Sequence, residues 1–282
     1  MDTLIRELSE SDLLAADDIL KFAFGGPVSR VDDLRLYRRI QPDGWFVATQ
    51  AGRLVGMVGA ANYGALAHVG LMAVHPDSQR QGIGRSLMQF LLDKLDRQGV
   101  PRVTLDASKM GRPLYEQLGF EPYDETITFQ RSADISVEPP SRAPQKISAG
   151  DLDELVQVDQ DAFGADRRKV FEILLDQFPG RAFLQRNQAG RLEGYLFTQR
   201  SRLGPWVMLV PGQAKELLLA GLALPYEGII SATVPGENRE AIELLQEYGF
   251  KQARVNLLMG RGNGGPPGRR ESIYSQTSLA VG

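Results

Sequence analysis

Apolar residues recur every three or four positions between residues 82 and 98, and this spacing predicts one face of an amphipathic helix. The apolar positions are Ile83, Leu87, Phe90, Leu91 and Leu95. The segment just before it, residues 69–74, is a continuous apolar run with the length of a buried strand. A strand is therefore expected to lead through a short turn into this helix.

The same patterns divide the first half of the chain into alternating elements. Strands are expected at residues 5–8, 45–49, 54–62, 69–74, 103–107 and 126–131. Helices are expected at residues 13–24, 31–40 and 82–98, with a short helix around Tyr115. This order predicts an α/β fold of mixed α+β type, with a twisted mixed central sheet flanked by helices.

The second half repeats the pattern less clearly. A strand at 206–210, a helix at 214–222, a strand at 229–234 and a short helix before Gly249-Phe250 follow the order of the first half. The Pro-rich stretch 132–145 between the halves is typical of a semi-rigid linker. We therefore predict two domains, 1–131 and 146–282, joined by residues 132–145.

The turn between the strand at 69–74 and the helix at 82–98 reads Gln79-Arg80-Gln81-Gly82-Ile83-Gly84. Its backbone N–H groups and the positive end of the helix dipole would form a small bowl that fits a phosphate or pyrophosphate. An ordinary Gly-rich turn is the alternative. The turn is neither a Walker A loop nor a Rossmann fingerprint, since the Lys-Ser/Thr pair and the third glycine are absent.

Two motifs at this spacing resemble the GNAT superfamily of acyl-CoA-dependent N-acyltransferases. Gln79, Gly82 and Gly84 match its Gln/Arg-x-x-Gly-x-Gly/Ala loop, and the run from Tyr115 to Gly119-Phe120 matches its Tyr-x-x-x-Gly-Phe motif. Most of the chain is similar to tandem bacterial GNAT proteins with a degenerate C-terminal domain. The resemblance implies two tandem GNAT-like domains, with acetyl-CoA bound by the first.

The resemblance also implies which residues hold the cofactor. Main-chain groups of Met72 and Val74 would pair with the pantetheine arm, and Val74 would stabilise the oxyanion. The turn and Ser108 would hold the rest of the cofactor. The implied cofactor-binding residues are Met72, Val74, Gln79, Arg80, Gln81, Gly82, Ile83, Gly84, Arg85 and Ser108.

Two side chains are candidates for proton transfer. Tyr115, with an ordinary pKa near 10, can protonate the leaving thiolate, and GNAT enzymes usually carry a tyrosine at this place. His68 begins the strand before the turn and is the first candidate for the general base; a water chain is the alternative. Each has a purely structural alternative, a core tyrosine and a packing histidine.

The second domain lacks both the tyrosine and the glycine-rich phosphate turn of the first. Leu245 stands where the first half has Tyr115, and the turn Val210-Pro211-Gly212-Gln213 has a single glycine and a proline that removes a donor. This copy is expected not to hold the cofactor in the family manner. It is expected instead to shape the acceptor site.

Composition narrows the chemistry. The 282 residues contain no cysteine and only two histidines, His68 and His75, which argues against disulfides, a thioester-bound enzyme intermediate and a multi-histidine metal site. We expect no bound metal and direct transfer in a ternary complex. A net charge of −3 gives no reason to expect nucleic-acid binding. No apolar run is long enough for a membrane span, and the N-terminal residues do not resemble a secretion signal, so a cytoplasmic location is expected.

The expected function is transfer of acetyl from acetyl-CoA to a primary amine of a small molecule or peptide. A non-catalytic acyl-CoA sensor and a two-domain scaffold with a vestigial loop are the alternatives, and a homodimer is a candidate assembly. Asp32, Asp33, Tyr37 and Asp106 are candidates to contact an ammonium group. A solvated acidic turn is the simpler interpretation of these residues.

Overall fold

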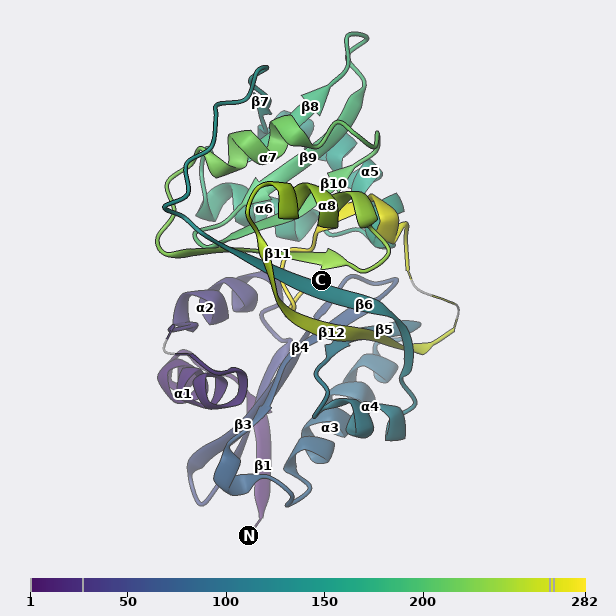
Figure 1. The fold of residues 1–282 in the computed structure, drawn as a ribbon. Coiled ribbons are helices and arrows are strands. Elements are labelled where there is room, and N and C mark those ends of the chain that lie inside the picture. Colours follow the sequence, from purple (N-terminus) through teal and green to yellow (C-terminus); the bar gives the residue numbers. More distant parts are fainter. Residues whose placement is uncertain (1, 27, 264, 266) are drawn as a thin grey trace. The chain divides into compact units, whose positions relative to one another are not determined.

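The computed structural model describes residues 2–26, 28–263, 265 and 267–282 (Figure 1). The chain forms two compact units. Unit 1 contains Met1–Leu105, Arg261–Asn263 and Val281, and unit 2 contains Asp106–Gly260, Gly264–Ala280 and Gly282. Each unit is described by itself.

Unit 1 is built on a mixed sheet with the strand order β1-β2-β3-β4-β5. The strands are β1 (Thr3–Glu7), β2 (Trp45–Gln50), β3 (Arg53–Asn62), β4 (Ala67–Val74) and β5 (Arg102–Ala107), whose last two residues belong to unit 2. Neighbours are antiparallel except β4 and β5, which are parallel. The helices are α1 (Leu13–Phe24), α2 (Val31–Ile40) and α3 (Ile83–Arg97).

Successive residues of β2 show how the sheet is covered on both faces. Trp45 stacks on Tyr37 of α2 with ring centroids 5.6 Å apart, whereas Phe46 contacts Phe90 of α3 at 5.1 Å. Strand residues alternate between faces, so α2 and α3 lie on opposite sides of the sheet, as Figure 1 shows. Tyr37 is therefore a core residue, and its predicted role toward an ammonium group has no support in this packing.

The strands of unit 2 follow one another in the order β12-β6-β11-β10-β9-β8-β7, and β13 pairs with β10. Its strands are β6 (Glu121–Ser132), β7 (Gln145–Lys146), β8 (Ala182–Arg186), β9 (Leu192–Thr198), β10 (Arg202–Met208), β11 (Ile229–Pro235), β12 (Lys251–Gly262), whose last two residues belong to unit 1, and β13 (Ile273–Ser275). Its helices are α4 (Arg112–Gln117), α5 (Leu152–Phe163), α6 (Arg168–Gln177), α7 (Lys215–Leu222) and α8 (Arg239–Glu247).

Strand β6 links the two halves of the sequence. It pairs antiparallel with β11 on one side and β12 on the other, so a strand of the first half lies between two strands of the second. The compact units are thus interleaved along the chain, and they differ from the predicted ranges 1–131 and 146–282. The functional division into a cofactor-binding domain and an accessory domain stays a prediction.

The fold class is confirmed, since each unit is a mixed sheet with helices. Helices α1 and α2 have the predicted bounds, and α3 begins and ends one residue inside its predicted range. The strands around residues 202–210 and 121–132 differ more: β10 lies earlier than predicted, and β6 is longer at both ends.

Candidate active site

Strand β4 carries a bulge shortly before the predicted phosphate turn. Met57 pairs with Ala73 and Gly59 with Gly70, so three steps on β4 match two on β3. Leu71 lies in this bulge with a φ of 54°, an unusual backbone angle for a side chain of its size. Bulges bend a strand, and the parallel ladder to β5 ends at Val69 and Leu105 in the described chain. The main chain at Met72 and Val74 thus follows the end of this ladder.

The turn after β4 has the predicted strand–turn–helix form. Arg80 and Gly82 adopt left-handed backbone angles, with φ of 61° and 81°, and Gly82 caps helix α3. A Cβ at Gly82 would meet open space. The first N–H groups of a helix have no acceptor within it, so those of Ile83 and Gly84 point out of the helix at the positive end of the dipole.

Two glutamine side chains brace this turn from within unit 1. Gln79 donates from Nε2 to the carbonyl oxygen of Val74 at 3.1 Å, and Gln81 donates to that of Asp77 at 3.3 Å. The Gln79 bond ties the start of the turn to the end of β4. The residues from Gln79 to Gly82 are exposed, so an anion can approach their backbone from solvent.

His68 is buried within the sheet of unit 1, with 2% of its surface exposed. Its Nδ1 forms a hydrogen bond of 3.0 Å with the hydroxyl of Thr104, the residue beside it on the parallel strand β5. The bond fixes the imidazole ring. Because the ring is buried, the amine substrate would have to pass its proton to His68 through an intervening group such as water. The role of His68 as general base therefore stays a prediction.

Tyr115 lies on α4 in unit 2 and is 8% exposed. Its ring contacts Phe120 edge-on at 6.1 Å, and a Cβ at Gly111 would lie only 2.9 Å from Tyr115 Cε2. Glycine at position 111 therefore leaves the space that the ring fills. Burial raises the pKa of Tyr115 to about 12, which keeps the phenol protonated and able to donate.

The raised pKa gives a testable pH dependence. Because burial disfavours the phenolate, we expect Tyr115 to stay neutral until the pH approaches about 12. The associated stability is present below about pH 10 and is lost as the pH rises through the folded value. The phenolate absorbance of the wild type minus that of Tyr115→Phe measures this group. A difference that titrates near pH 10 would contradict the assignment.

Ser108 caps the turn that leads into α4. Its hydroxyl accepts from the backbone N–H of Gly111 at 3.2 Å. Asn238 does the same before α8, where Oδ1 accepts from the backbone N–H of Ala241 at 2.9 Å. The two positions therefore carry the same kind of cap. Cofactor binding by Ser108 stays a prediction.

The two short helices also end alike. Phe120 donates its backbone N–H to Tyr115 and Phe250 donates its own to Leu245, both at 3.0 Å, and Gly119 and Gly249 have φ of 83° and 81°. The difference lies in the side chains. Leu245 is packed in the apolar core of unit 2 and has no hydroxyl group to donate a proton.

The turn of the second half differs from the phosphate turn in what its backbone contacts. The N–H of Gly212 donates to the carboxylate of Glu240 on α8. The Glu240 carboxylate therefore already accepts a hydrogen bond from a backbone N–H group that a bound phosphate would need. Together with Pro211, this favours the prediction that the second copy does not bind the cofactor.

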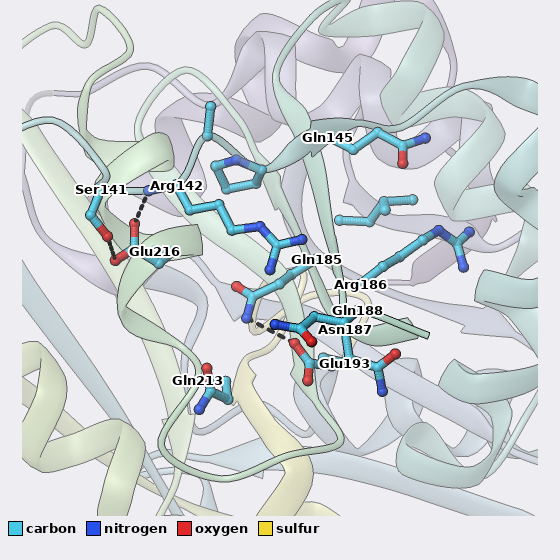
Figure 2. Close-up of a pocket in the computed structure, with 13 residues that line it drawn as sticks. Ser141, Arg142, Gln145, Gln185, Arg186, Asn187, Gln188, Glu193, Gln213 and Glu216 are labelled. Atoms are coloured by element: carbon cyan, nitrogen blue, oxygen red, sulfur yellow. Dashed lines mark hydrogen bonds between the residues drawn. The ribbon is translucent and has the colours of Figure 1, made fainter. Parts of the chain in front are cut away.

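Unit 2 also has a cavity of about 470 Å³ (Figure 2). Glu216 anchors the linker at its rim: its carboxylate accepts from the Ser141 hydroxyl at 2.7 Å and from the Arg142 N–H at 3.1 Å. Figure 2 shows the Arg142 side chain extending toward Gln185, which donates to Glu193. None of the residues lining it is a predicted site residue.

The described residues contain no cluster of three or more histidine, aspartate or glutamate side chains that could hold a metal ion. In the same part of the chain, no helix combines the length and the apolar character needed to cross a bilayer.

Comparison with known proteins assigns the family. Residues 25–134 and residues 155–275 each match a family described as "Acetyltransferase (GNAT) domain". Among solved structures, a putative acetyltransferase from Pyrococcus horikoshii is 26% identical with a TM-score of 0.84, over 99% of this chain and 96% of that one. The chain belongs to the GNAT acetyltransferase superfamily and carries two such domains in tandem.

Curated relatives point the same way. An uncharacterized N-acetyltransferase, YitH, of Bacillus subtilis is 26% identical over 205 residues, which is 71% of each chain. The [ribosomal protein bS18]-alanine N-acetyltransferase of Escherichia coli is 44% identical over 52 residues, 17% of this chain and 35% of that protein. These relatives support an acyltransferase in general terms.

Some features of the site were not predicted. The bulge at Leu71 has no local signal, since leucine rarely adopts a positive φ. The hydrogen bond between His68 and Thr104 depends on the parallel register of β4 and β5. The alternation pattern within one strand does not predict that register.

Proposed function

We propose that the protein transfers the acetyl group of acetyl-CoA to a primary amine of a small molecule or peptide. The observation that carries the proposal is the exposed turn between the bulged strand β4 and helix α3, with its left-handed Arg80 and Gly82 and a helix N-terminus that no side chain caps. Such a turn suits the pyrophosphate of coenzyme A. The family supports acetyl transfer in general, and the acceptor class is part of the proposal.

The proposed cofactor contacts come from strand β4, from the turn that follows it and from Ser108. The pyrophosphate binds the backbone from Gln79 to Arg85, and the pantetheine arm pairs with the main chain at Met72 and Val74. Ser108 adds a hydroxyl. Bound acetyl-CoA supplies the thioester that the amine attacks. Helix dipole and backbone donors stabilise the phosphates, and the side chains of Arg80 and Arg85 add positive charge.

The proposed proton transfers use two residues. Tyr115 gives its phenolic proton to the departing thiolate, which its raised pKa permits, because the phenol is neutral at every pH at which the enzyme would work. His68 removes the proton of the amine, with a water chain as the alternative base. We place the reaction in the cytoplasm.

A peptide amine is one acceptor class under this proposal. The bS18-alanine N-acetyltransferase is named for action on a ribosomal protein, and it shares 44% identity with this chain over 52 residues. Mycothiol acetyltransferase of Acidothermus cellulolyticus, 32% identical over 127 residues, represents a small-molecule enzyme by its name. The two relatives keep both acceptor classes within the proposal.

Direct transfer makes a kinetic prediction. The chain has no cysteine, so a thioester-bound enzyme intermediate cannot form on it, and direct transfer with both substrates bound at once is the expected course. Initial rates measured at several fixed concentrations of the amine should give double-reciprocal lines that intersect. Parallel lines would mean a covalent intermediate and would refute direct attack.

A non-catalytic acyl-CoA sensor is the second candidate, because the same turn would bind the cofactor without turnover. The two functions separate in one experiment. A sensor binds acetyl-CoA but releases no free coenzyme A when offered a panel of primary amines and peptides. An enzyme releases coenzyme A in step with the acetylated amine.

A further inference from the structure

The cavity of unit 2 forms where strand β7 stops. This strand has only two residues, Gln145–Lys146, and Pro144 before it has no N–H group with which to extend the ladder. Strand β8 continues to Arg186, while the linker turns toward Glu216 of α7. The space between the linker, the β8–β9 hairpin and α7 measures about 470 Å³ (Figure 2). Ligand pockets usually measure roughly 300–1,000 Å³, so a small molecule fits here.

Arg142 brings a positive charge into this cavity that no carboxylate of the chain contacts. Its backbone N–H is bound by Glu216, but its guanidinium forms no hydrogen bond or ion pair with any residue that the structure describes. Figure 2 shows its side chain extending across the cavity toward Gln185. A guanidinium offers five N–H donors in a planar fork that matches a carboxylate. A ligand that suits this cavity therefore carries a carboxylate.

Glu193 provides a negative charge that is held in position. Gln185 donates from Nε2 to Glu193 Oε2 at 3.1 Å, and in this orientation Gln185 Oε1 is buried without a donor among the described residues. The bond to Glu193 therefore sets the orientation of the carboxamide. Glu193 forms no ion pair in the described part of the chain. Its carboxylate is available to an ammonium group of a ligand.

Glu216 provides a second negative charge in the wall of the cavity. Burial acts to raise the pKa of Glu216, but hydrogen bonds from Ser141 and Arg142 outweigh burial and, with a smaller effect of the Lys215 charge, lower it. The carboxylate is therefore ionised at neutral pH. Both hydrogen-bond donors are neutral groups, and the Lys215 ammonium lies against Glu138 at 3.4 Å. No described cation forms an ion pair with Glu216.

The fourth charged residue of the wall is already matched. Arg186 pairs with Glu154 at 2.7 Å and with Asp151 at 3.3 Å, and neither acid lines the cavity. The described wall thus has one cation and two anions that lack a contact of opposite charge. A ligand with one carboxylate and two cationic groups complements this set.

The rest of the described lining favours a polar ligand as well. Four residues carry carboxamides, which can both donate and accept hydrogen bonds: Gln145, Asn187, Gln188 and Gln213. The apolar lining residues are Ala143, Pro144 and Leu184. These three offer too little apolar surface to recognise a hydrophobic molecule.

We propose that this cavity binds a free basic amino acid of the lysine type, with its carboxylate on Arg142 and its two ammonium groups toward Glu193 and Glu216. The inference goes beyond the proposed function, because it assigns unit 2 a ligand of its own. It does not depend on acetyl transfer.

Calorimetric titration with three related probes tests the charge match. L-Lysine has the carboxylate and both ammonium groups, L-norleucine lacks the side-chain ammonium, and cadaverine lacks the carboxylate. The full-length protein at neutral pH should bind L-lysine at least about tenfold more tightly than either other probe, because each of these omits one ion pair. No binding of L-lysine at millimolar concentration, or equal binding of L-norleucine or cadaverine, would overturn the inference.

Two variants then assign the ends of the ligand. Arg142→Gln should weaken L-lysine binding about tenfold and should not weaken cadaverine binding, because cadaverine has no carboxylate to lose. Glu193→Gln should weaken the binding of both probes. The matched control is Arg191→Gln, since Arg191 is exposed on the same β8–β9 hairpin but does not line the cavity. This control should bind L-lysine like the wild type, and the melting temperature of each variant shows whether its fold is intact.

The outcomes also separate this inference from the proposed function. If Arg142→Gln and Arg191→Gln weaken L-lysine binding equally, general surface charge explains the binding and the inference is wrong. Acetyl-CoA binding and release of coenzyme A are measured on the same wild-type sample. If these fail while L-lysine binding still depends on Arg142, the proposed function is wrong and the amino-acid site remains.

Discussion

Gly84→Glu should reduce acetyl-CoA affinity by about 100-fold or more, which corresponds to about 2.7 kcal/mol. Gly84 lies in the first turn of α3, where the N–H groups and the dipole favour an anion. A glutamate there places its own carboxylate where the pyrophosphate would bind and repels it. Calorimetric titration of acetyl-CoA measures the loss.

The control for this change is Gly84→Ala. The family motif accepts alanine at this place, and a methyl group adds neither charge nor a competing acceptor. Alanine also favours a helix over glycine by up to about 1 kcal/mol. We expect Gly84→Ala to bind acetyl-CoA within a few-fold of the wild type. If Gly84→Glu binds as well as the wild type, the cofactor does not lie at this turn.

Tyr115→Phe should lower kcat by about 100-fold or more, the usual contribution of a positioned general acid. In the proposed reaction the phenol supplies the proton to the departing thiolate, and phenylalanine keeps the ring that packs on Phe120. Acetyl-CoA affinity and the fold should stay close to those of the wild type. Steady-state kinetics with a turned-over amine, together with calorimetry, separate the two effects.

Tyr226→Phe is the matched control for the loss of a buried phenol. Tyr226 is also in unit 2, its pKa is raised by burial, and its hydroxyl donates to the Gly221 carbonyl oxygen at 2.9 Å. Removing this hydrogen bond should cost about 1 kcal/mol of stability and leave kcat unchanged. Equal kcat values for Tyr115→Phe and the wild type would remove Tyr115 from the chemistry.

The local part of the site could be predicted from the sequence because its signals are local. The 3.6-residue period places the start of α3, and two glycines directly before and within its first turn mark the phosphate turn. The run from Tyr115 to Phe120 and its copy from Leu245 to Phe250 mark the two short helices.

Pairings between distant strands could not be predicted in the same way. Strand β6 reads as the last strand of the first half, yet its partners are β11 and β12, about a hundred residues away. Thr126 and Asn256 become neighbours only through this pairing. The pairing of Thr126 with Asn256 could therefore not be predicted, although the alternation of Thr126, Ile127 and Thr128 is present in the sequence.

The acidic side chain at the second turn is another long-range feature. Pro211 and the single Gly212 predict from the sequence that the turn has lost its phosphate site. Glu240 is distant in sequence, on helix α8, and could not be linked to the turn in the same way. Its contact with the Gly212 N–H depends on the packing of α8 against the turn. The sequence predicts the loss of the phosphate site, and the structure shows that the Glu240 carboxylate accepts the hydrogen bond that an anion would take.

The stoichiometry of acetyl-CoA binding tests the central claim most directly. Calorimetric titration of the wild-type chain should show one site per chain, because the first turn is open and the second is occupied by Glu240. No binding would contradict the proposal that this protein is an acetyl-CoA-dependent enzyme. Two sites per chain would contradict the assignment of the second GNAT domain as an accessory domain that does not bind the cofactor.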